Sequence, residues 1–97
     1  MGTTGLRRYA NKRDANEPDI VDALRKAGCS VYVMDKPSDL LVGYLGATHL
    51  CEVKSAKGKL TEDQQDFFDG WRGDYWIIRN IAEAIEVLNL WHRKAAA

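Results

Sequence analysis

The sequence has no apolar run near the roughly 20 residues that a membrane-spanning helix requires, so we expect no membrane association. It begins with polar and basic residues and lacks the apolar segment of a secretory signal peptide. Cysteine is scarce as well: Cys29 and Cys51 stand 22 positions apart, and neither has a partner at the spacing of a metal site. Their β-branched neighbours favour two buried free thiols in a cytoplasmic protein over a disulfide.

A net charge is also missing, because 14 Lys and Arg balance 14 Asp and Glu, which argues against avid binding of nucleic acid. The charges are unevenly distributed, with ten basic and seven acidic residues in 1–60 (net +3) and four against seven in 61–97 (net −3). The basic clusters are Arg7, Arg8, Lys12 and Arg13, and then Lys54, Lys57 and Lys59. Charge alone favours ordinary solvated side chains, but a polyanion would meet this first half of the chain.

Repeats and linkers are absent, and 97 residues suit one core, so we expect a single domain over residues 1–97 with 1–12 as a flexible basic arm. Three segments have the pattern of an amphipathic helix. They open at Asn16, Thr61 and Asn80, which are residues that cap helix N-termini, and Gly28 ends the first. The expected buried faces are Ile20, Val21, Leu24 and Ala27; Phe67, Phe68 and Trp71; and Ile81, Ile85, Leu88 and Trp91.

Apolar runs at residues 29–35, 39–54 and 74–80 predict strands, and the middle run contains the glycines of a hairpin turn. The order is αβββαβα. Short connections make the first three strands antiparallel, whereas a crossover through a helix makes the third and fourth parallel. The sequence therefore predicts an α/β fold with a mixed four-stranded sheet flanked by helices.

Three charged residues stand at the ends of the hairpin strands. Asp39 follows a turn-like Pro37-Ser38, and counting back from the hairpin turn places it opposite Glu52, within one residue. Opposed side chains on one sheet face lie about 5 Å apart, and two carboxylates at that distance repel unless a cation separates them. Mg²⁺ is such a cation, and Lys54, on the same face as Glu52, would sit beside a bound phosphate. The simpler interpretation is that Glu52 and Lys54 form the solvent face of a half-buried strand.

These motifs resemble the PD-(D/E)xK nuclease superfamily, and most of all the small virus-type replication-repair nucleases (VRR-NUC) of phages and prophages. The resemblance covers about residues 11–90. It includes Glu17 near the start of the first helix, DLLVG (39–43), EVK (52–54), LTEDQ (60–64) and a late WRG (71–73). The family usually has proline directly before the aspartate, whereas here Ser38 intervenes.

The resemblance implies a restriction-endonuclease-like core and a Mg²⁺- or Mn²⁺-dependent phosphodiesterase that leaves a 5′-phosphate. It implies Asp39, Glu52 and the Val53 carbonyl as metal ligands and Lys54 as the catalytic lysine. Glu17 would reach the metal directly or through water, and Gln64 would join the active site. Two of these roles have structural alternatives: Glu17 suits any helix N-terminus, and Gln64 forms a capping box with Thr61.

We therefore expect an endonuclease that cuts branched or otherwise distorted DNA, such as junctions or flaps, as a homodimer in the cytoplasm of a bacterium or a phage-infected host. No organic cofactor is expected. The nucleic-acid contacts would be Arg7, Arg8, Lys12, Arg13, Lys57 and Lys59. One alternative is a non-catalytic nucleic-acid-binding or assembly module with the same fold, and another is a protein-interaction domain that uses Trp71 and Trp91. His49 and His92 are expected to be structural, and the three tryptophans to be packing residues.

Overall fold

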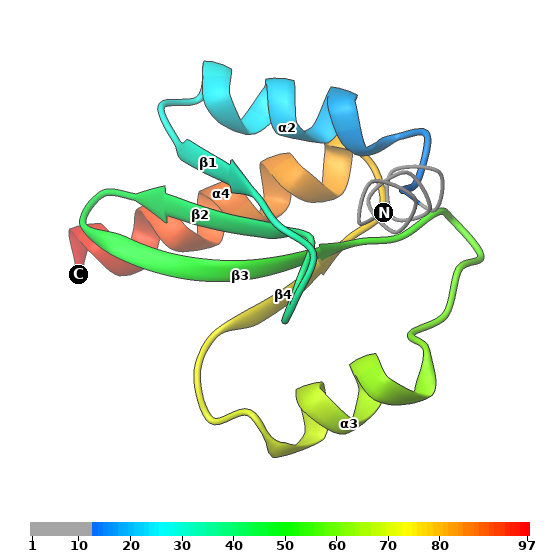
Figure 1. The fold of residues 1–97 in the computed structure, drawn as a ribbon. Coiled ribbons are helices and arrows are strands. Elements are labelled where there is room, and N and C mark those ends of the chain that lie inside the picture. The colour runs from blue at the N-terminus through cyan, green and yellow to red at the C-terminus, as the bar shows by residue number, and fades with distance from the viewer. Residues whose placement is uncertain (1–12) are drawn as a thin grey trace, which may run out of the picture.

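A computed structural model describes residues 13–97. Its elements follow the predicted order (Figure 1): α2 (Glu17–Lys26), β1 (Ser30–Val33), β2 (Leu40–Tyr44), β3 (Ala47–Val53), α3 (Glu62–Gly70), β4 (Tyr75–Ile78) and α4 (Ile81–Ala96). None of the helices in this part of the chain combines the length and the apolar character needed to cross a membrane.

The four strands form one sheet in the order β1-β2-β3-β4, so the predicted mixed sheet is confirmed. β1, β2 and β3 pair antiparallel, and β3 pairs parallel with β4 after the crossover through α3. Leu45 and Gly46 form the two-residue turn of the hairpin, with φ of 50° and 85°. Positive φ at both central residues is typical of a tight turn that matches the strand twist.

The core lies between one face of the sheet and the helices α2 and α4, which cover that face together (Figure 1). Alternation in β3 turns His49, Cys51 and Val53 to this side, and all three are buried. Both cysteines are free and buried, as predicted. The remaining core side chains are Ile20, Val21, Leu24, Leu40, Val42, Ile78, Ala84, Val87, Leu88 and Trp91.

The predicted face of α4 is wrong in its first half. Ile81 and Ile85 are 45% and 50% exposed, and Ala84 and Val87 take the buried positions instead. The observed stripe of residues 84, 87, 88 and 91 has the i, i+3, i+4, i+7 spacing of one helix face. Ala27 is also exposed, because it lies at the C-cap of α2 beyond the last buried turn.

α3 lies on the opposite side of the sheet and buries none of its residues, so its predicted core face is wrong (Figure 1). Phe68 and Trp71 are 39% and 45% exposed, and Phe67 is partly buried. The helix is attached through an aromatic cluster in which the Phe67 ring lies 5.1 Å from Trp71 and 5.5 Å from Tyr75. Trp71 is therefore not a core residue, in contrast to the buried Trp91 and the partly buried Trp76.

Candidate active site

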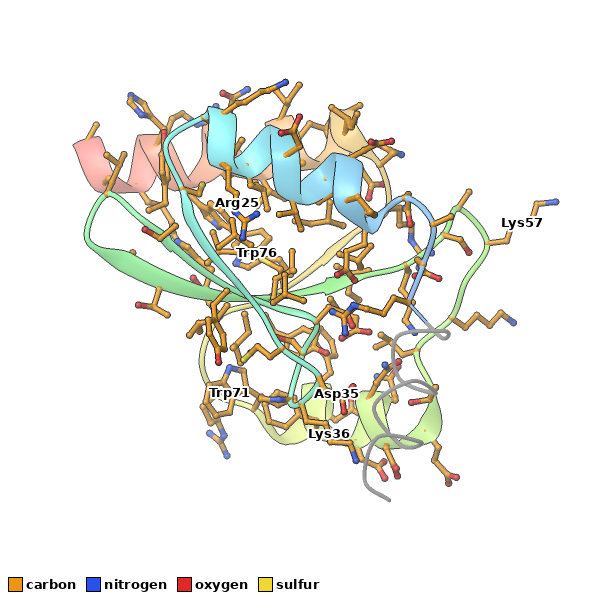
Figure 2. The ribbon with its side chains drawn as sticks, turned by 45° about the horizontal axis from the view of Figure 1, so that its top comes forward. Arg25, Asp35, Lys36, Lys57, Trp71 and Trp76 are labelled. Carbon is orange, nitrogen blue, oxygen red and sulfur yellow. The ribbon has the colours of Figure 1, made fainter. Side chains whose placement is uncertain are left out.

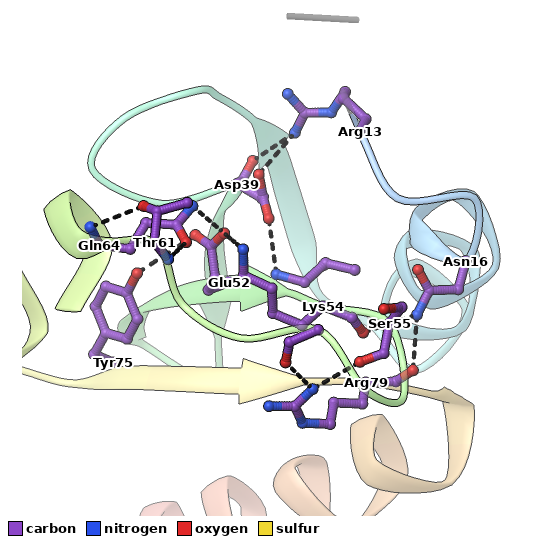
Figure 3. Close-up of polar contacts among 12 residues, drawn as sticks. Arg13, Asn16, Asp39, Glu52, Lys54, Ser55, Thr61, Gln64, Tyr75 and Arg79 are labelled. Carbon is purple, nitrogen blue, oxygen red and sulfur yellow. Dashed lines mark hydrogen bonds and ion pairs between the residues drawn. The ribbon is translucent and has the colours of Figure 1, made fainter. Parts of the chain in front are cut away.

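Hairpin register brings Asp39 and Glu52 together at the ends of β2 and β3. The last ladder pair is Leu40 with Cys51, so Asp39 stands one step further on, beside Glu52, as the count from the turn predicted. Asp39 is fixed there because its Oδ2 accepts a hydrogen bond from the Val53 main-chain N–H at 2.8 Å (Figure 3). The two carboxylates therefore meet where the strands separate.

Glu52 and Lys54 do not form a solvent face, so that simpler interpretation is wrong. Glu52 is only 2% exposed, and the Lys54 side chain is 13% exposed. The Lys54 Nζ lies 3.7 Å from the Glu52 Oε2, as expected for residues two apart on one strand face. An ammonium and a carboxylate are thus held together on the side of the sheet that faces α3.

Gln64 forms the predicted capping box and also contacts Glu52. Its Oε1 accepts from the Thr61 N–H at 2.9 Å, while the Thr61 hydroxyl accepts from the Gln64 N–H at 3.2 Å, which is a complete capping box. The same side chain donates from Nε2 to the Glu52 Oε2 at 2.9 Å (Figure 3). The helix cap therefore aims the amide of Gln64 at the buried carboxylate.

Tyr75 is a site residue that the sequence reasoning missed. Its hydroxyl donates to the Glu52 Oε1 at 3.4 Å. The parallel pairing places Tyr75 opposite Leu50, which shares the sheet face of Glu52. The sequence could have indicated this, because pairing the last strand with the strand of Glu52 assigns Tyr75 to the same sheet face.

Arg13, which is predicted as a phosphate contact, lines the cavity of the site itself. Its Nε lies 2.8 Å from the Glu17 Oε2, and its Nη2 lies 3.7 Å from the Asp39 Oδ1 and 3.3 Å from the Asp39 main-chain oxygen. One guanidinium thus neutralises two carboxylates. Arg13 lies in a bend before α2, so this ion pair connects the preceding segment to the first residue of the helix.

Glu17 is buried, with 6% of its surface exposed, but it does not line the cavity of the site. Arg13 bonds one of its oxygens, and the other, Oε1, is buried without a partner among the described residues. Asn16 stands at the N-cap position of α2, as predicted, but its side chain makes no capping hydrogen bond. Its Nδ2 donates instead to the main-chain oxygens of Lys54 and Arg79.

A cavity of about 280 Å³ opens between these groups. Two cationic and several anionic side chains therefore share one small volume. The lining residues are Arg13, Asp14, Asp35, Asp39, Glu52, Val53, Lys54, Thr61 and Gln64. A larger hollow of about 480 Å³, between residues 35–37 and the start of α3, adjoins it through Asp35, Thr61 and Gln64.

The electrostatics of this cavity favour protonation of Glu52. Burial, and then the negative charge of Asp39, raise the pKa of Glu52 from 4.5 to about 8, although Lys54 opposes the change. Burial also raises the pKa of Glu17, against the effect of Arg13. The pKa of Tyr75 is raised by burial and by the neighbouring Glu52. Burial thus disfavours the charged forms of Glu17 and Glu52, and Asp39 adds to this effect at both residues.

Within residues 13–97, no group of three or more His, Cys, Asp and Glu side chains is arranged to hold a metal ion. Mg²⁺ does not need such a group, because it is commonly held by one or two carboxylates with water and phosphate oxygens completing the octahedron. Asp39 and Glu52 supply hard oxygen donors, and a cation between them would offset the repulsion by Asp39 that, after burial, raises the pKa of Glu52. This donor set fits Mg²⁺ or Mn²⁺.

The other predicted residues lie outside this cavity. Lys57 and Lys59 are exposed on the loop after β3, and Figure 2 shows Lys57 projecting from the tip of that loop. Arg7, Arg8 and Lys12 lie outside the described residues. His49 is buried on the opposite face of the sheet, stacked on Trp91 at 3.9 Å and paired with Asp74, whereas His92 is exposed on α4.

Comparison of the chain with family models, with curated proteins and with solved structures gave no match.

Proposed function

We propose that this protein is a Mg²⁺- or Mn²⁺-dependent endonuclease that hydrolyses phosphodiester bonds in DNA. The observation that supports it best is the meeting of Asp39 and Glu52 at adjacent strand ends, with the ammonium of Lys54 3.7 Å from Glu52. This arrangement is also what a PD-(D/E)xK nuclease of the VRR-NUC type would require, with the described αβββαβα elements as a restriction-endonuclease-like core.

Asp39 and Glu52 would hold the metal, with the Val53 carbonyl as a third donor. When bound, a divalent cation polarises a phosphoryl oxygen and lowers the pKa of a coordinated water. Lys54 would hold the attacking water and offset the negative charge that develops on the phosphate. The attacking water would lose a proton as its oxygen bonds to phosphorus, and O3′ would take up a proton as the P–O3′ bond breaks, so the products carry a 5′-phosphate and a 3′-hydroxyl.

Gln64 and Tyr75 would orient Glu52, since their donors contact both of its oxygens. Arg13 would have to leave Asp39 when a metal arrives, and its guanidinium would then be free for the substrate phosphate. Glu17 would retain Arg13 close to the site through the 2.8 Å ion pair and would reach the metal through water.

The basic side chains Arg13 and Lys54 line the cavity, and contacts of such side chains with phosphates carry no base-sequence information. The proposed substrate is therefore one that is recognised by backbone and shape, namely branched or distorted DNA such as junctions and flaps. Two copies would cut two strands, which favours a homodimer. The proposed place of action is the cytoplasm of a bacterium or of a phage-infected host.

A second candidate function is a non-catalytic nucleic-acid-binding or assembly module. The observation in its favour is that protein groups already contact the carboxylates: Val53 and Arg13 contact Asp39, and Gln64, Tyr75 and Lys54 contact Glu52. A site that is neutralised in this way can be stable without a metal.

Cleavage assays separate the two candidates. Labelled junction, flap and linear duplex DNA would be incubated with Mg²⁺ or Mn²⁺, with EDTA as the blank, for the parent and for Lys54→Ala. The nuclease proposal predicts metal-dependent cleavage that is lost in Lys54→Ala. Equal cleavage by both proteins, or none by the parent, would overturn it, and DNA affinity that persists without metal would then favour the binding module.

A further inference from the structure

The loop that follows β3 is a folded turn attached to the rest of the protein. The N–H of Gly58 donates to the main-chain oxygen of Ser55 at 3.1 Å, which closes a turn over residues 55–58. A Cβ at Gly58 would lie 2.9 Å from the Ser55 Oγ and 3.3 Å from its main-chain nitrogen, so the two ends of the turn are tightly packed. The loop therefore has a defined shape although it is polar and exposed.

Arg79 holds this turn from the end of β4. Its Nη1 donates to the main-chain oxygens of Ser55 and Gly58, both at 2.7 Å, as Figure 3 shows for Arg79 and Ser55. The Arg79 backbone is fixed in turn, because its N–H donates to the Glu83 Oε1 at 2.8 Å. The guanidinium thus spans the two ends of the turn instead of projecting into solvent.

Asn16 forms hydrogen bonds at the start of the same loop. Its Nδ2 donates to the main-chain oxygen of Lys54 at 3.1 Å and to that of Arg79 at 2.7 Å, which joins the start of α2 to the ends of β3 and β4 (Figure 3). The Lys54 N–H also donates to the Ile78 oxygen at 3.1 Å. The backbone at Lys54 is therefore held from two sides, directly before the turn.

Two lysines on this loop make no ion pair with any described residue: Lys57 lies within the turn and Lys59 directly after it. Both are exposed, and they follow the partly buried Lys54 within five positions. Ammonium groups on a fixed backbone lose less conformational freedom on binding than the same groups on a mobile loop. Both lysines lie outside the Asp39–Glu52 cavity, on the loop that begins at Lys54, which does line it.

We infer that Arg79 is a positioning residue for substrate binding: by bonding the carbonyls of Ser55 and Gly58, it presents Lys57 and Lys59 as a preformed site for the sugar–phosphate backbone outside the Asp39–Glu52 cavity. The inference rests on the proposed function for the identity of its ligand. Arg79 itself does not contact the substrate, since its Nη1 donors are directed at the loop.

A double-mutant cycle tests this inference without cleavage. Affinity for a fluorescent four-way junction would be measured by anisotropy in Ca²⁺, at several salt concentrations around 0.1 M, for four proteins. These are the parent, Arg79→Ala, Lys57→Ala with Lys59→Ala, and the combined variant. Arg93→Ala is the matched control, because Arg93 is an exposed arginine in the last turn of α4.

Removal of the two lysines is expected to weaken binding about tenfold and to reduce the salt slope by about 1.8, at about 0.9 for each phosphate contact. Arg79→Ala is expected to weaken binding several-fold in the parent but less than about twofold in the lysine-free protein, since nothing is then left to position. Additive effects would overturn the inference, as would an Arg79→Ala protein that binds like Arg93→Ala.

Folding is checked by thermal melting, and Arg79→Lys replaces Arg79→Ala in the same cycle if the alanine variant unfolds.

Failure of this inference and failure of the proposed function give different results. A parent protein that binds and cuts DNA but gives an additive cycle refutes the role of Arg79 alone. A parent that neither binds nor cuts DNA refutes the proposed function.

Discussion

Replacement of Glu52 by glutamine tests the electrostatics of the site. In the folded protein the pKa of Glu52 is raised from 4.5 to about 8, chiefly by burial and by Asp39. A raised pKa means that the folded state holds its proton more tightly than the unfolded state does. The resulting stability is fully present below pH 4.5 and is lost as the pH rises towards 8.

The size of the effect follows from these two pKa values. At 1.36 kcal/mol per pKa unit, the difference between 4.5 and about 8 gives a total loss of about 5 kcal/mol, of which about 3 kcal/mol has occurred by pH 7. Glutamine resembles the protonated acid in shape but has no charge to lose. The Glu52→Gln protein should therefore keep about 3 kcal/mol of unfolding free energy at pH 7 that the parent loses.

Urea unfolding followed by tryptophan fluorescence measures this difference, at pH 4.5 and pH 7 in EDTA. Glu86→Gln is the matched control, because Glu86 is an exposed residue of α4 and its replacement should leave the pH profile of the parent unchanged. Addition of Mg²⁺ at pH 7 should stabilise the parent but not Glu52→Gln. Parallel profiles of unfolding free energy against pH for the parent and Glu52→Gln would refute the claim that burial and Asp39 raise the pKa of Glu52.

Three further predictions concern its neighbours. Lys54→Ala should lower the cleavage rate at least about 100-fold in single-turnover assays, because the ammonium acts on the phosphate. The affinity for Mn²⁺ should stay within a few-fold of that of the parent. A cleavage rate within threefold of the parent would contradict this role. Gln64→Glu should keep the helix cap and hence the melting temperature, yet slow cleavage, because a carboxylate cannot donate to Glu52; an unchanged rate would restrict Gln64 to capping. Arg13→Gln should tighten Mn²⁺ binding in calorimetry, because its guanidinium competes for Asp39; weaker binding would contradict that competition.

The hairpin and the meeting of Asp39 with Glu52 were predictable because they depend on local rules. In a hairpin with a two-residue turn, counting residues outward from the turn gives every cross-strand pair. Counted in this way, Asp39 stands opposite Glu52, as the structure has it. The parallel pairing of β3 with β4 also follows from the length of the connection between them.

The burial of Glu52 was not predictable in this way, since it depends on Gln64, Tyr75 and Lys54, which converge from three elements. The aromatic residues of α3 looked like a core face, yet the sheet side that they meet is incompletely covered, and Trp71 stays 45% exposed. Asn16 is a residue type that commonly caps helices, but its side-chain amide donates to the main-chain oxygens of Lys54 and Arg79, which are far away in the sequence.

Diffraction from a crystal soaked in Mn²⁺ tests the central claim most directly. An anomalous peak is expected within bonding distance of one oxygen of Asp39 and one of Glu52, with Arg13 moved away from Asp39. The absence of a peak at saturating Mn²⁺, with Arg13 still on Asp39 and Gln64 still on Glu52, would contradict it.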